Sequence, residues 1–361
     1  MALATIVSVR GSTYRRPGAR LLVPEDGEPI GNISGGCLEG DVADVAKVVM
    51  AGGEPRLASF DLTADDEVVW GWGLGCNGAI EVFVEPADKA AAVAGVLRQA
   101  LEDERALAVV TVLESTLSGI ERGDRMVVHP DGARQGSLGQ PHADQTVADR
   151  AVDLLAAGES VTEELDVGPG RIRAFFEVLQ PPLRLLVCGA GHDAVPVVRF
   201  AASLGWRAVV IDDRPAFLTA ERFPGAAGFV HVERPEEASR AAGVDRGTHV
   251  VVMSHNYLRD RDYLRSFLGT DVAYIGTLGP RARLERLLAD LAEEGVRPSE
   301  ADLAKLHGPA GLDIGSEGPE EIAWAILAEV LAARGVRPAG FLRDRQGPIH
   351  ERPGAPAEVR G

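Results

Sequence analysis

The hydrophobic and polar positions follow different patterns in the two halves of the chain. In the first half, short apolar runs alternate with glycine-rich turns, which is typical of strands in a small sheet. Over residues 42–49, valine and alanine recur every three or four positions, which predicts an amphipathic helix that ends at Gly52 and Gly53. We therefore expect a smaller mixed α/β domain here. The expected strands are 3–9, 19–23, 57–62, 79–85, 107–113, 125–129, 161–165 and 171–179, and further helices are expected at 89–101 and 148–157.

Beyond residue 182, mainly apolar runs alternate with helical segments, which is the pattern of a Rossmann-like, doubly wound parallel sheet. Pro181 and Pro182 can neither donate a hydrogen bond to a sheet nor enter a helix interior, so they mark a boundary. The predicted domains are residues 1–180, residues 181–340 and a flexible tail at 341–361, where proline, glycine and charge mix without periodicity. The expected strands are 183–188, 207–211, 227–231, 248–253 and 272–275, followed by a long helix at 320–333.

Composition and charge narrow the class of protein. The 361 residues carry 37 Lys and Arg against 54 Asp and Glu, and the net charge of −17 argues against nonspecific binding to nucleic acid. The apolar runs are much shorter than the roughly 20 residues of a membrane helix, so we expect no membrane partner. Three cysteines cannot close a disulfide framework, and the first residues do not resemble a secretory signal, so we expect a reduced, cytoplasmic protein. Such a chain is compatible with a homodimer, although nothing in the sequence specifies one.

A glycine-rich turn follows the first apolar run of the second half, at residues 189–194 (Gly-Ala-Gly-His-Asp-Ala). Between a strand and a helix, Gly189 permits a tight turn and Gly191 lets a pyrophosphate approach the backbone at the helix N-terminus. Asp212 ends the next apolar run at about the 20-residue spacing of a ribose-binding carboxylate. The set favours a nucleotide-like ligand; the alternative is that the glycines serve packing alone.

The neighbours of this turn have simpler interpretations. His192 is atypical of a plain dinucleotide site, and Asp213 follows Asp212 at the end of the run. Arg214 could bind a phosphate, but we expect it to be an exposed partner of Asp213. Cys188 ends a buried strand and is expected to be a small core residue.

The other two cysteines lie in glycine-rich loops. Ser34, Gly35 and Gly36 precede Cys37 at the start of a predicted helix, where backbone N–H groups can form an anion-binding nest and the helix dipole acidifies a thiol. Cys76 lies in a second such loop, at residues 73–78. A lone cysteine is usually a small buried residue. Because both of these cysteines lie in glycine-rich loops, we favour a role for their soft thiolates in sulfur transfer or in binding a soft metal cofactor. They do not have the C-x-x-C spacing of a structural zinc site. Glu39, Asp41 and Asp44 oppose a thiolate, whereas Arg15, Arg16 and Arg20 could restore positive charge.

Taken together, the motifs resemble those of the XdhC/CoxI family, the accessory proteins of xanthine dehydrogenase and of aerobic carbon monoxide dehydrogenase. The resemblance reaches to about residue 335, and the order of the motifs is more specific than any one of them. The matching segments are 11–19 (Gly-Ser-Thr-Tyr-Arg-Arg-Pro-Gly-Ala), 34–40, 75–78, 189–192, 211–214, 254–255 (Ser-His), 274–279, 306–315 (Leu-His-Gly-Pro-Ala-Gly-Leu-Asp-Ile-Gly) and 319–322.

The resemblance implies a chaperone of the molybdenum cofactor (molybdopterin) rather than a catalyst. Such a protein binds the cofactor, presents it to a cysteine desulfurase for sulfuration, and delivers it to a molybdenum hydroxylase apo-enzyme. Cys37, then Cys76, would handle the cofactor. Gly189, Gly191 and Asp212 would hold its phosphate or nucleotide end, or a separate NAD(P). The histidines expected at the carboxyl edge of the second sheet are His192, His255 and His307.

Two other functions stay open on the residues alone. The turn at Gly189 with Asp212 also suits an NAD(P)-dependent oxidoreductase, although no acid or base for hydride transfer is identifiable. A nucleotide-binding redox sensor would require Cys37 and Cys76 to react readily. The client enzyme, and the choice between a mononucleotide and a dinucleotide form of the pterin, are not specified.

Overall fold

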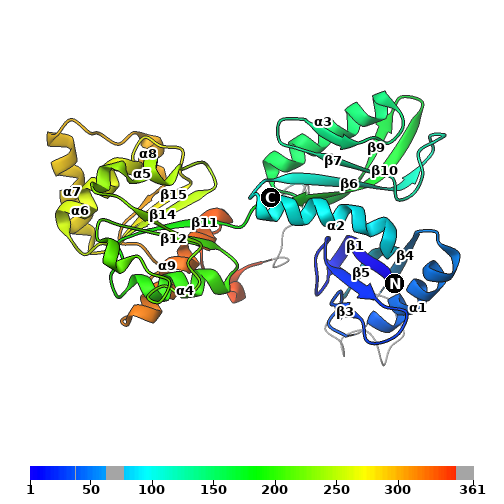
Figure 1. Ribbon diagram of the computed structural model, residues 1–361, viewed down its shortest axis with the longest axis horizontal. Helices are drawn as coiled ribbons and strands as arrows, with labels where there is room; N and C mark the ends of the chain where they lie inside the picture. Colours follow the sequence, from blue (N-terminus) through cyan, green and yellow to red (C-terminus); the bar gives the residue numbers. More distant parts are fainter. Residues whose placement is uncertain (37, 62–76, 347–361) are drawn as a thin grey trace. The chain divides into compact units, whose positions relative to one another are not determined.

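The computed structural model describes residues 1–36, 38–61 and 77–346, drawn as ribbons in Figure 1. The chain divides into two compact units, with the division between Pro181 and Pro182. Within the described ranges, no helix is long and apolar enough to cross a membrane. Cys37 and Cys76 both lie outside the described residues.

The first unit begins with a five-stranded antiparallel sheet in the order β3-β2-β1-β5-β4. Helix α1 packs on one face because Val42, Ala46 and Val49 lie on one side of it and are buried. Gly53 ends the helix in the left-handed conformation (φ +72°), which confirms the predicted helix end. The elements are β1 (Ala2–Ser12), β2 (Arg20–Val23), β3 (Ile30–Gly31), α1 (Glu39–Gly52), β4 (Arg56–Asp61) and β5 (Asn77–Pro86).

A second antiparallel sheet, in the order β8-β7-β6-β10-β9, completes the first unit. Helix α3 covers one face of it. The predicted start of that helix, residue 148, was wrong, because the helix begins at Pro141, whose fixed φ suits a first helical position. The inner faces of the two sheets meet at Val7, Phe83, Leu113 and Phe175. The elements are α2 (Ala87–Glu102), β6 (Leu107–Ser115), β7 (Arg125–Val128), β8 (Arg134–Gly136), α3 (Pro141–Ala157), β9 (Val161–Val167) and β10 (Gly170–Leu179).

The second unit is a six-stranded parallel sheet in the order β13-β12-β11-β14-β15-β16. This is the Rossmann strand order: successive strands are added on one side of β11 up to β13, and the order then reverses, so that β14 lies on the other side of β11. Its strands are β11 (Arg184–Cys188), β12 (Arg207–Asp212), β13 (Gly228–His231), β14 (Thr248–Val252), β15 (Tyr274–Thr277) and β16 (Leu306–His307).

Helices cover both faces of this parallel sheet (Figure 1). Helices α4 and α9 pack on one face, and α5, α6 and α7 pack on the other. The predicted fold class is therefore confirmed: a smaller mixed α/β part and a Rossmann-like part. The helices are α4 (Ala194–Ser203), α5 (Ala238–Ala242), α6 (Tyr257–Phe267), α7 (Arg281–Glu293), α8 (Glu300–Ala304) and α9 (Pro319–Arg334), with 3₁₀ turns at Pro215–Phe217, Pro235–Glu237 and Leu342–Asp344.

Candidate functional site

The turn after β11 lies at the point where the strand order of the parallel sheet reverses. Gly189 has φ +117°, and a Cβ added to it would lie 2.6 Å from Cα of Ser254, at the end of β14. A side chain here is excluded by both the backbone conformation and the space, so Gly189 permits the close packing of two strand ends. At Gly191, an added Cβ would lie 3.4 Å from the ring of His255. The structure therefore brings Gly189, Gly191 and His255 together at one edge of the sheet.

Asp212 ties this turn to the end of β12. Its carboxylate is 1% exposed and accepts hydrogen bonds from the Ala190 amide (2.6 Å) and from the Arg214 amide (2.9 Å) and side chain (2.8 Å to Nε and to Nη2). Burial alone would raise the pKa of Asp212, but the hydrogen bonds from Arg214 and Ala190 outweigh it and lower the pKa. Asp212 therefore holds the turn in shape, and contact with a ribose would require it to release these donors.

Arg214 was expected to be an exposed partner of Asp213, and its Nε does lie within ion-pair distance of Asp213 Oδ1, at 4.0 Å. Arg214 is half-buried rather than exposed, however, and makes its bidentate ion pair with the buried Asp212. Asp213 also pairs with Arg259 of α6 at 2.6 Å. Its Oδ1 atom is buried and accepts no hydrogen bond from the described residues, so Asp213 retains an acceptor beside the turn.

His255 follows β14 and contacts the other side of the turn. Its Nε2 is 3.0 Å from Oδ2 of Asp193, and its backbone has φ +57°, which is uncommon outside glycine. Asp193 stands at the N-cap of α4 but makes no capping hydrogen bond, so the first turn of α4 carries no side-chain cap. His192 is exposed. The Val195 amide donates to the His192 carbonyl at 3.1 Å and Pro196 has no N–H, so among the first three residues of α4 the amide of Ala194 remains suited to an anion.

Arg222 was missed by the sequence interpretation, because no motif marks it. Its Nε donates to the Ala190 carbonyl at 3.2 Å, and its guanidinium lies 5.0 Å from the ring centroid of Phe217. Its Nη2 is buried and finds no acceptor among the described residues. One donor on Arg222 and one acceptor on Asp213 thus border the turn without partners.

A buried network fixes the end of β14 next to the same turn. Asp260 is 3% exposed and accepts from the Ser254 amide at 3.0 Å and from the Ser254 hydroxyl at 2.6 Å. Arg283 of α7 donates to its other oxygen at 2.7 Å. Asp260 and Arg283 were also missed, because no motif marks either residue and Arg283 reaches Asp260 from 23 residues further along the chain. They act by holding Ser254, against which Gly189 packs.

His307 belongs to a separate network at another edge of the sheet. Its Nδ1 lies 3.1 Å from Glu329 Oε1, while Tyr274 donates its hydroxyl to Glu329 Oε2 at 2.6 Å. Burial would raise the pKa of Glu329, but the hydrogen bonds from His307, Tyr274 and the Gly311 amide lower it. Burial raises the pKa of Tyr274. This group stabilises the β15–β16 edge.

In the first unit, the glycine loop before α1 contains an anion already. The carboxylate of Glu39 accepts hydrogen bonds from the amides of Ser34 (3.0 Å) and Gly36 (3.0 Å), and from the Ser34 hydroxyl. The Ile33 and Leu38 amides complete the set at 3.3 and 3.2 Å. The nest expected from Ser34, Gly35 and Gly36 is thus present, and the protein's own carboxylate occupies it.

Two of the three arginines before this loop, Arg15 and Arg20, have other partners. Arg15 Nε donates to Asn32 Oδ1 at 3.2 Å, the same atom that accepts from the Gly35 amide at 3.1 Å. Arg20 Nη2 pairs with Glu177 of β10 at 2.5 Å.

Burial would raise the pKa of Glu39, yet its hydrogen bonds with Ser34 and neighbouring amides lower the pKa below its usual value.

Cys188, the cysteine that the structure describes, is a core residue. It is fully buried in the cluster beneath α6, and burial raises the pKa of its thiol. A buried thiol of this kind is inert toward metals and electrophiles at neutral pH. Within the described parts of the chain, no three His, Cys, Asp or Glu side chains are placed to hold a metal ion.

The family of the protein follows from its similarity to known sequences. The profile of the XdhC Rossmann domain matches residues 185–330, and that of the XdhC and CoxI family matches residues 1–61 and 100–166. These matches extend over both units. The chain belongs to the XdhC and CoxI family, as the ordered motifs predicted.

Three relatives illustrate the range of the family. The chain is 32% identical over 342 residues to a Bacillus subtilis (strain 168) protein named as a probable subunit of xanthine dehydrogenase, with 92% of each chain covered. It is 23% identical over 339 residues to the molybdenum cofactor insertion chaperone PaoD of Escherichia coli (strain K12), covering 92% of this chain and 83% of that one. A crystal structure described as a xanthine dehydrogenase from Bacillus halodurans matches with a TM-score of 0.73 and 30% identity over 94% of both chains.

Proposed function

We propose that this protein is an accessory factor that binds the molybdenum cofactor and delivers it to a molybdenum hydroxylase of the xanthine dehydrogenase type. The observation that carries the proposal is a likeness over 92% of the chain to two proteins, one named as a molybdenum cofactor insertion chaperone and the other as a probable subunit of xanthine dehydrogenase. Among the described segments, the turn after β11 is the one suited to the phosphate-bearing end of such a cofactor.

The described residues fit the phosphate-bearing end of the cofactor at the turn after β11. The first turn of α4 has no side-chain cap, and the amide of Ala194 and the helix dipole favour an anion, although Val195 already donates to the His192 carbonyl and Pro196 has no N–H. The unpartnered Nη2 of Arg222 can donate to a phosphate oxygen, and the unpartnered Oδ1 of Asp213 can accept from a hydroxyl or amino group. By contrast, the amides of residues 33–38 already bind Glu39, so a phosphate would have to displace that carboxylate.

The cofactor supplies a molybdenum atom bound by the dithiolene of a pterin. We assign the sulfur-handling role first to Cys37 and then to Cys76, because soft thiolates suit soft metals and sulfur transfer. In this scheme Gly191, with His255 and Asp193 beside it, positions the ligand, while Gly189 and Asp212 keep the turn in shape. Sulfuration would involve a cysteine desulfurase, and a homodimer is compatible with this scheme.

The proposal is tested by producing the protein in a host that makes the cofactor and measuring pterin fluorescence after oxidation of the purified protein. We expect roughly stoichiometric pterin in the wild type and a strong loss in Cys37→Ser. Cys188→Ala is the matched control, because the described thiol is buried and its removal should leave retention unchanged. A wild-type protein without pterin, in a host whose hydroxylases contain it, would overturn the proposal.

The sulfuration step has a separate readout. In a strain that lacks this protein, the client hydroxylase should contain little molybdenum, and the molybdenum that it does contain should carry little cyanide-releasable sulfide. A low molybdenum content with a normal ratio of cyanide-releasable sulfide to molybdenum would remove sulfuration from the scheme and leave binding and delivery intact.

A second candidate, binding of NAD(P), is favoured by the Rossmann strand order and the uncapped start of α4. The four hydrogen bonds that Asp212 already accepts argue against this second function, because they leave its carboxylate no free position for a ribose hydroxyl. Calorimetric titration with NADH and NADPH separates the two functions, because an oxidoreductase must bind one of these cofactors at micromolar concentrations.

A further inference from the structure

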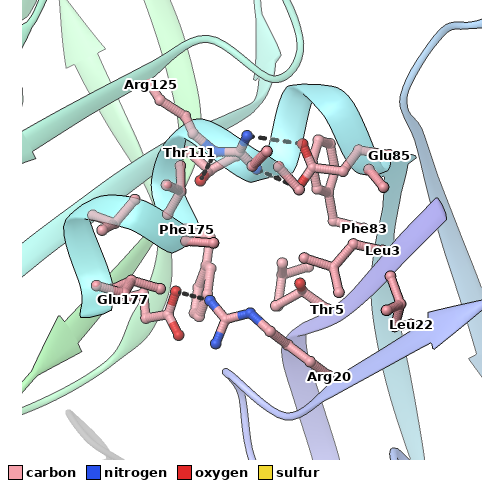
Figure 2. Close-up of a pocket in the computed structure, with 18 of the residues that line it drawn as sticks. Leu3, Thr5, Arg20, Leu22, Phe83, Glu85, Thr111, Arg125, Phe175 and Glu177 are labelled. Carbon is pink, nitrogen blue, oxygen red and sulfur yellow. Dashed lines mark hydrogen bonds and ion pairs between the residues drawn. The ribbon is translucent and has the colours of Figure 1, made fainter. Parts of the chain in front are cut away.

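The first unit contains a cavity whose lining includes Arg20 but none of the predicted cofactor-binding residues. It lies between the inner faces of the two antiparallel sheets and beneath α2, with a volume of about 500 Å³ (Figure 2). Pockets for small organic ligands commonly have volumes of about 300 to 1,000 Å³. Its lining comes from β1, β2, β5, α2, β6, β7 and β10, so the cavity exists only because both sheets fold against one another.

The walls of this cavity are mainly apolar. Phe83 and Phe175 line it from opposite sheets, and Leu3 and Leu22 line it from β1 and β2 (Figure 2). Along α2, the exposed lining residues are Ala91, Ala94, Arg98 and Leu101. The cavity is therefore accessible along this helix, and an apolar group that enters it would be removed from contact with water.

Two ion pairs stand at opposite ends of the cavity (Figure 2). Arg125 donates to both oxygens of Glu85 at 2.8 and 2.5 Å and to the Thr111 hydroxyl at 3.1 Å, and Glu85 is 2% exposed. At the other end, Arg20 pairs with Glu177 through Nη2 and donates through Nη1 to the Gly18 carbonyl, so its Nε stays available. Arg125 uses all three of its nitrogens, whereas Arg20 does not.

A third guanidinium lines the cavity without a carboxylate partner. Arg98 of α2 makes no ion pair with any described residue. The lining therefore carries Arg20, Arg98 and Arg125 against Glu85 and Glu177, an excess of one positive charge. This local excess contrasts with the net charge of −17 of the whole chain. A mainly apolar cavity with one uncompensated cation is complementary to an apolar molecule that bears one negative charge.

We propose that this cavity binds a small amphipathic monoanion, a carboxylate with an aliphatic or aromatic body. The body occupies the cavity beside Phe83 and Phe175, and the carboxylate is recognised by Arg98, with Arg20 Nε as a second donor. A dianionic phosphate is disfavoured, because the lining has a single uncompensated positive charge. The site is independent of the turn after β11 and of the proposed cofactor binding.

Calorimetric titration of the full chain with decanoate, below micelle formation, tests this proposal. Decanoate should bind saturably. Uncharged 1-decanol should bind at least fivefold more weakly, because it cannot satisfy the guanidinium, and acetate should not bind detectably, because it has no apolar body.

Two variants and one control locate the binding. Arg98→Gln removes the uncompensated charge and should weaken decanoate binding at least fivefold. Ala94→Trp fills the cavity from an exposed helical position and should abolish binding, with an unchanged circular dichroism spectrum as the check of folding. Arg56→Gln removes an exposed arginine outside the cavity and should bind decanoate as the wild type does.

The proposal is overturned if the wild type does not bind decanoate saturably, if 1-decanol binds as tightly, or if Ala94→Trp binds decanoate unchanged. Absence of binding together with a dimer that Ala94→Trp breaks would assign this surface to a second copy of the chain instead. None of these outcomes depends on pterin retention, so the two proposals fail separately.

Discussion

Two glycine-rich segments of this protein each precede a helix, but only one of them has several of its backbone amides occupied by a carboxylate of the protein itself. In the loop before α1, the carboxylate of Glu39 accepts from the amides of Ser34 and Gly36, so the nest contains an internal anion. In the turn before α4, the carboxylate of Asp212 accepts from the single amide of Ala190 and lies beneath the turn. The first turn of α4 stays uncapped.

The difference shows that a glycine-rich loop and a following helix N-terminus do not by themselves make a ligand site. What decides is what the nearby carboxylates bind. Glu39, at the first position of α1, folds back into the nest, whereas Asp193, at the N-cap of α4, pairs with His255 and does not cap its helix. Asp212, on the neighbouring strand, accepts from only one amide of the turn. We therefore expect ligand phosphate at α4 and a structural role for the amides before α1.

Gly189→Ala should have the largest effect on stability. The added Cβ would lie 2.6 Å from the Ser254 backbone at φ +117°, so we expect a loss of about 3 to 5 kcal/mol in the free energy of unfolding. Gly36→Ala is the matched substitution in the other loop. It has a similar φ of +113° but open space around it, so we expect about 1 to 2 kcal/mol. If urea unfolding gave the same loss of stability for Gly189→Ala and Gly36→Ala, close packing would not distinguish the two segments.

Asp212→Asn should cause the next largest loss of stability. The substitution removes the charge that binds Arg214 and leaves a buried amide against several donors, so we expect a loss of about 2 to 3 kcal/mol. Asp271→Asn, at an exposed aspartate whose ion pair with Arg246 is 3.9 Å long, should change stability by less than about 0.5 kcal/mol. If Asp212→Asn matched this control in urea unfolding, Asp212 would not be the residue that holds the turn.

Glu39→Gln should cost less, about 1 to 2 kcal/mol, because Glu39 is half-buried and a glutamine oxygen can still accept some of its hydrogen bonds. Glu28→Gln serves as the control, since Glu28 is exposed. Thermal unfolding of the two variants provides the comparison. A Glu39→Gln protein as stable as the control would mean that the nest does not need its internal carboxylate.

The smallest effect concerns pH. Asp212 and Glu39 both have a lowered pKa in the folded protein, so each stabilises the fold fully above its unfolded pKa of about 4 and loses this contribution as the pH falls through the lower folded value. The difference in free energy of unfolding between the wild type and either variant should therefore shrink between pH 7 and pH 3. Urea titrations at both pH values measure it, and a gap that widens on acidification would contradict the assigned charges.

Much of the fold could be predicted from periodicity. Apolar runs separated by helical segments indicated the parallel sheet, and the spacing of Val42, Val45 and Val49 indicated α1. The short strands β3, β8 and β16 were missed, because two or three residues carry no period. The early start of α3 was missed because its first turn is polar and is set by Pro141 at its N-terminus.

The candidate site was less predictable. The sequence indicated the turn residues Gly189 and Gly191, but not the partners that decide what the turn can bind. Arg222 and Asp260 come to the turn through tertiary packing, and no local pattern marks them. The position of Glu39 directly after a glycine nest was a usable signal, since an acidic residue in the first helical turn commonly binds free amides. The cavity beneath α2 depends on contacts between two sheets and has no counterpart in the sequence pattern.

The most direct test of phosphate binding at α4 is an anaerobic fluorescence titration of purified molybdopterin cofactor into the wild type, Arg222→Gln and Glu39→Gln. If the phosphate end binds at the start of α4, Arg222→Gln should weaken binding about tenfold, or about 1.4 kcal/mol, while Glu39→Gln should bind as the wild type does. Unchanged affinity in Arg222→Gln together with altered affinity in Glu39→Gln would place the phosphate at the loop before α1 and contradict this assignment.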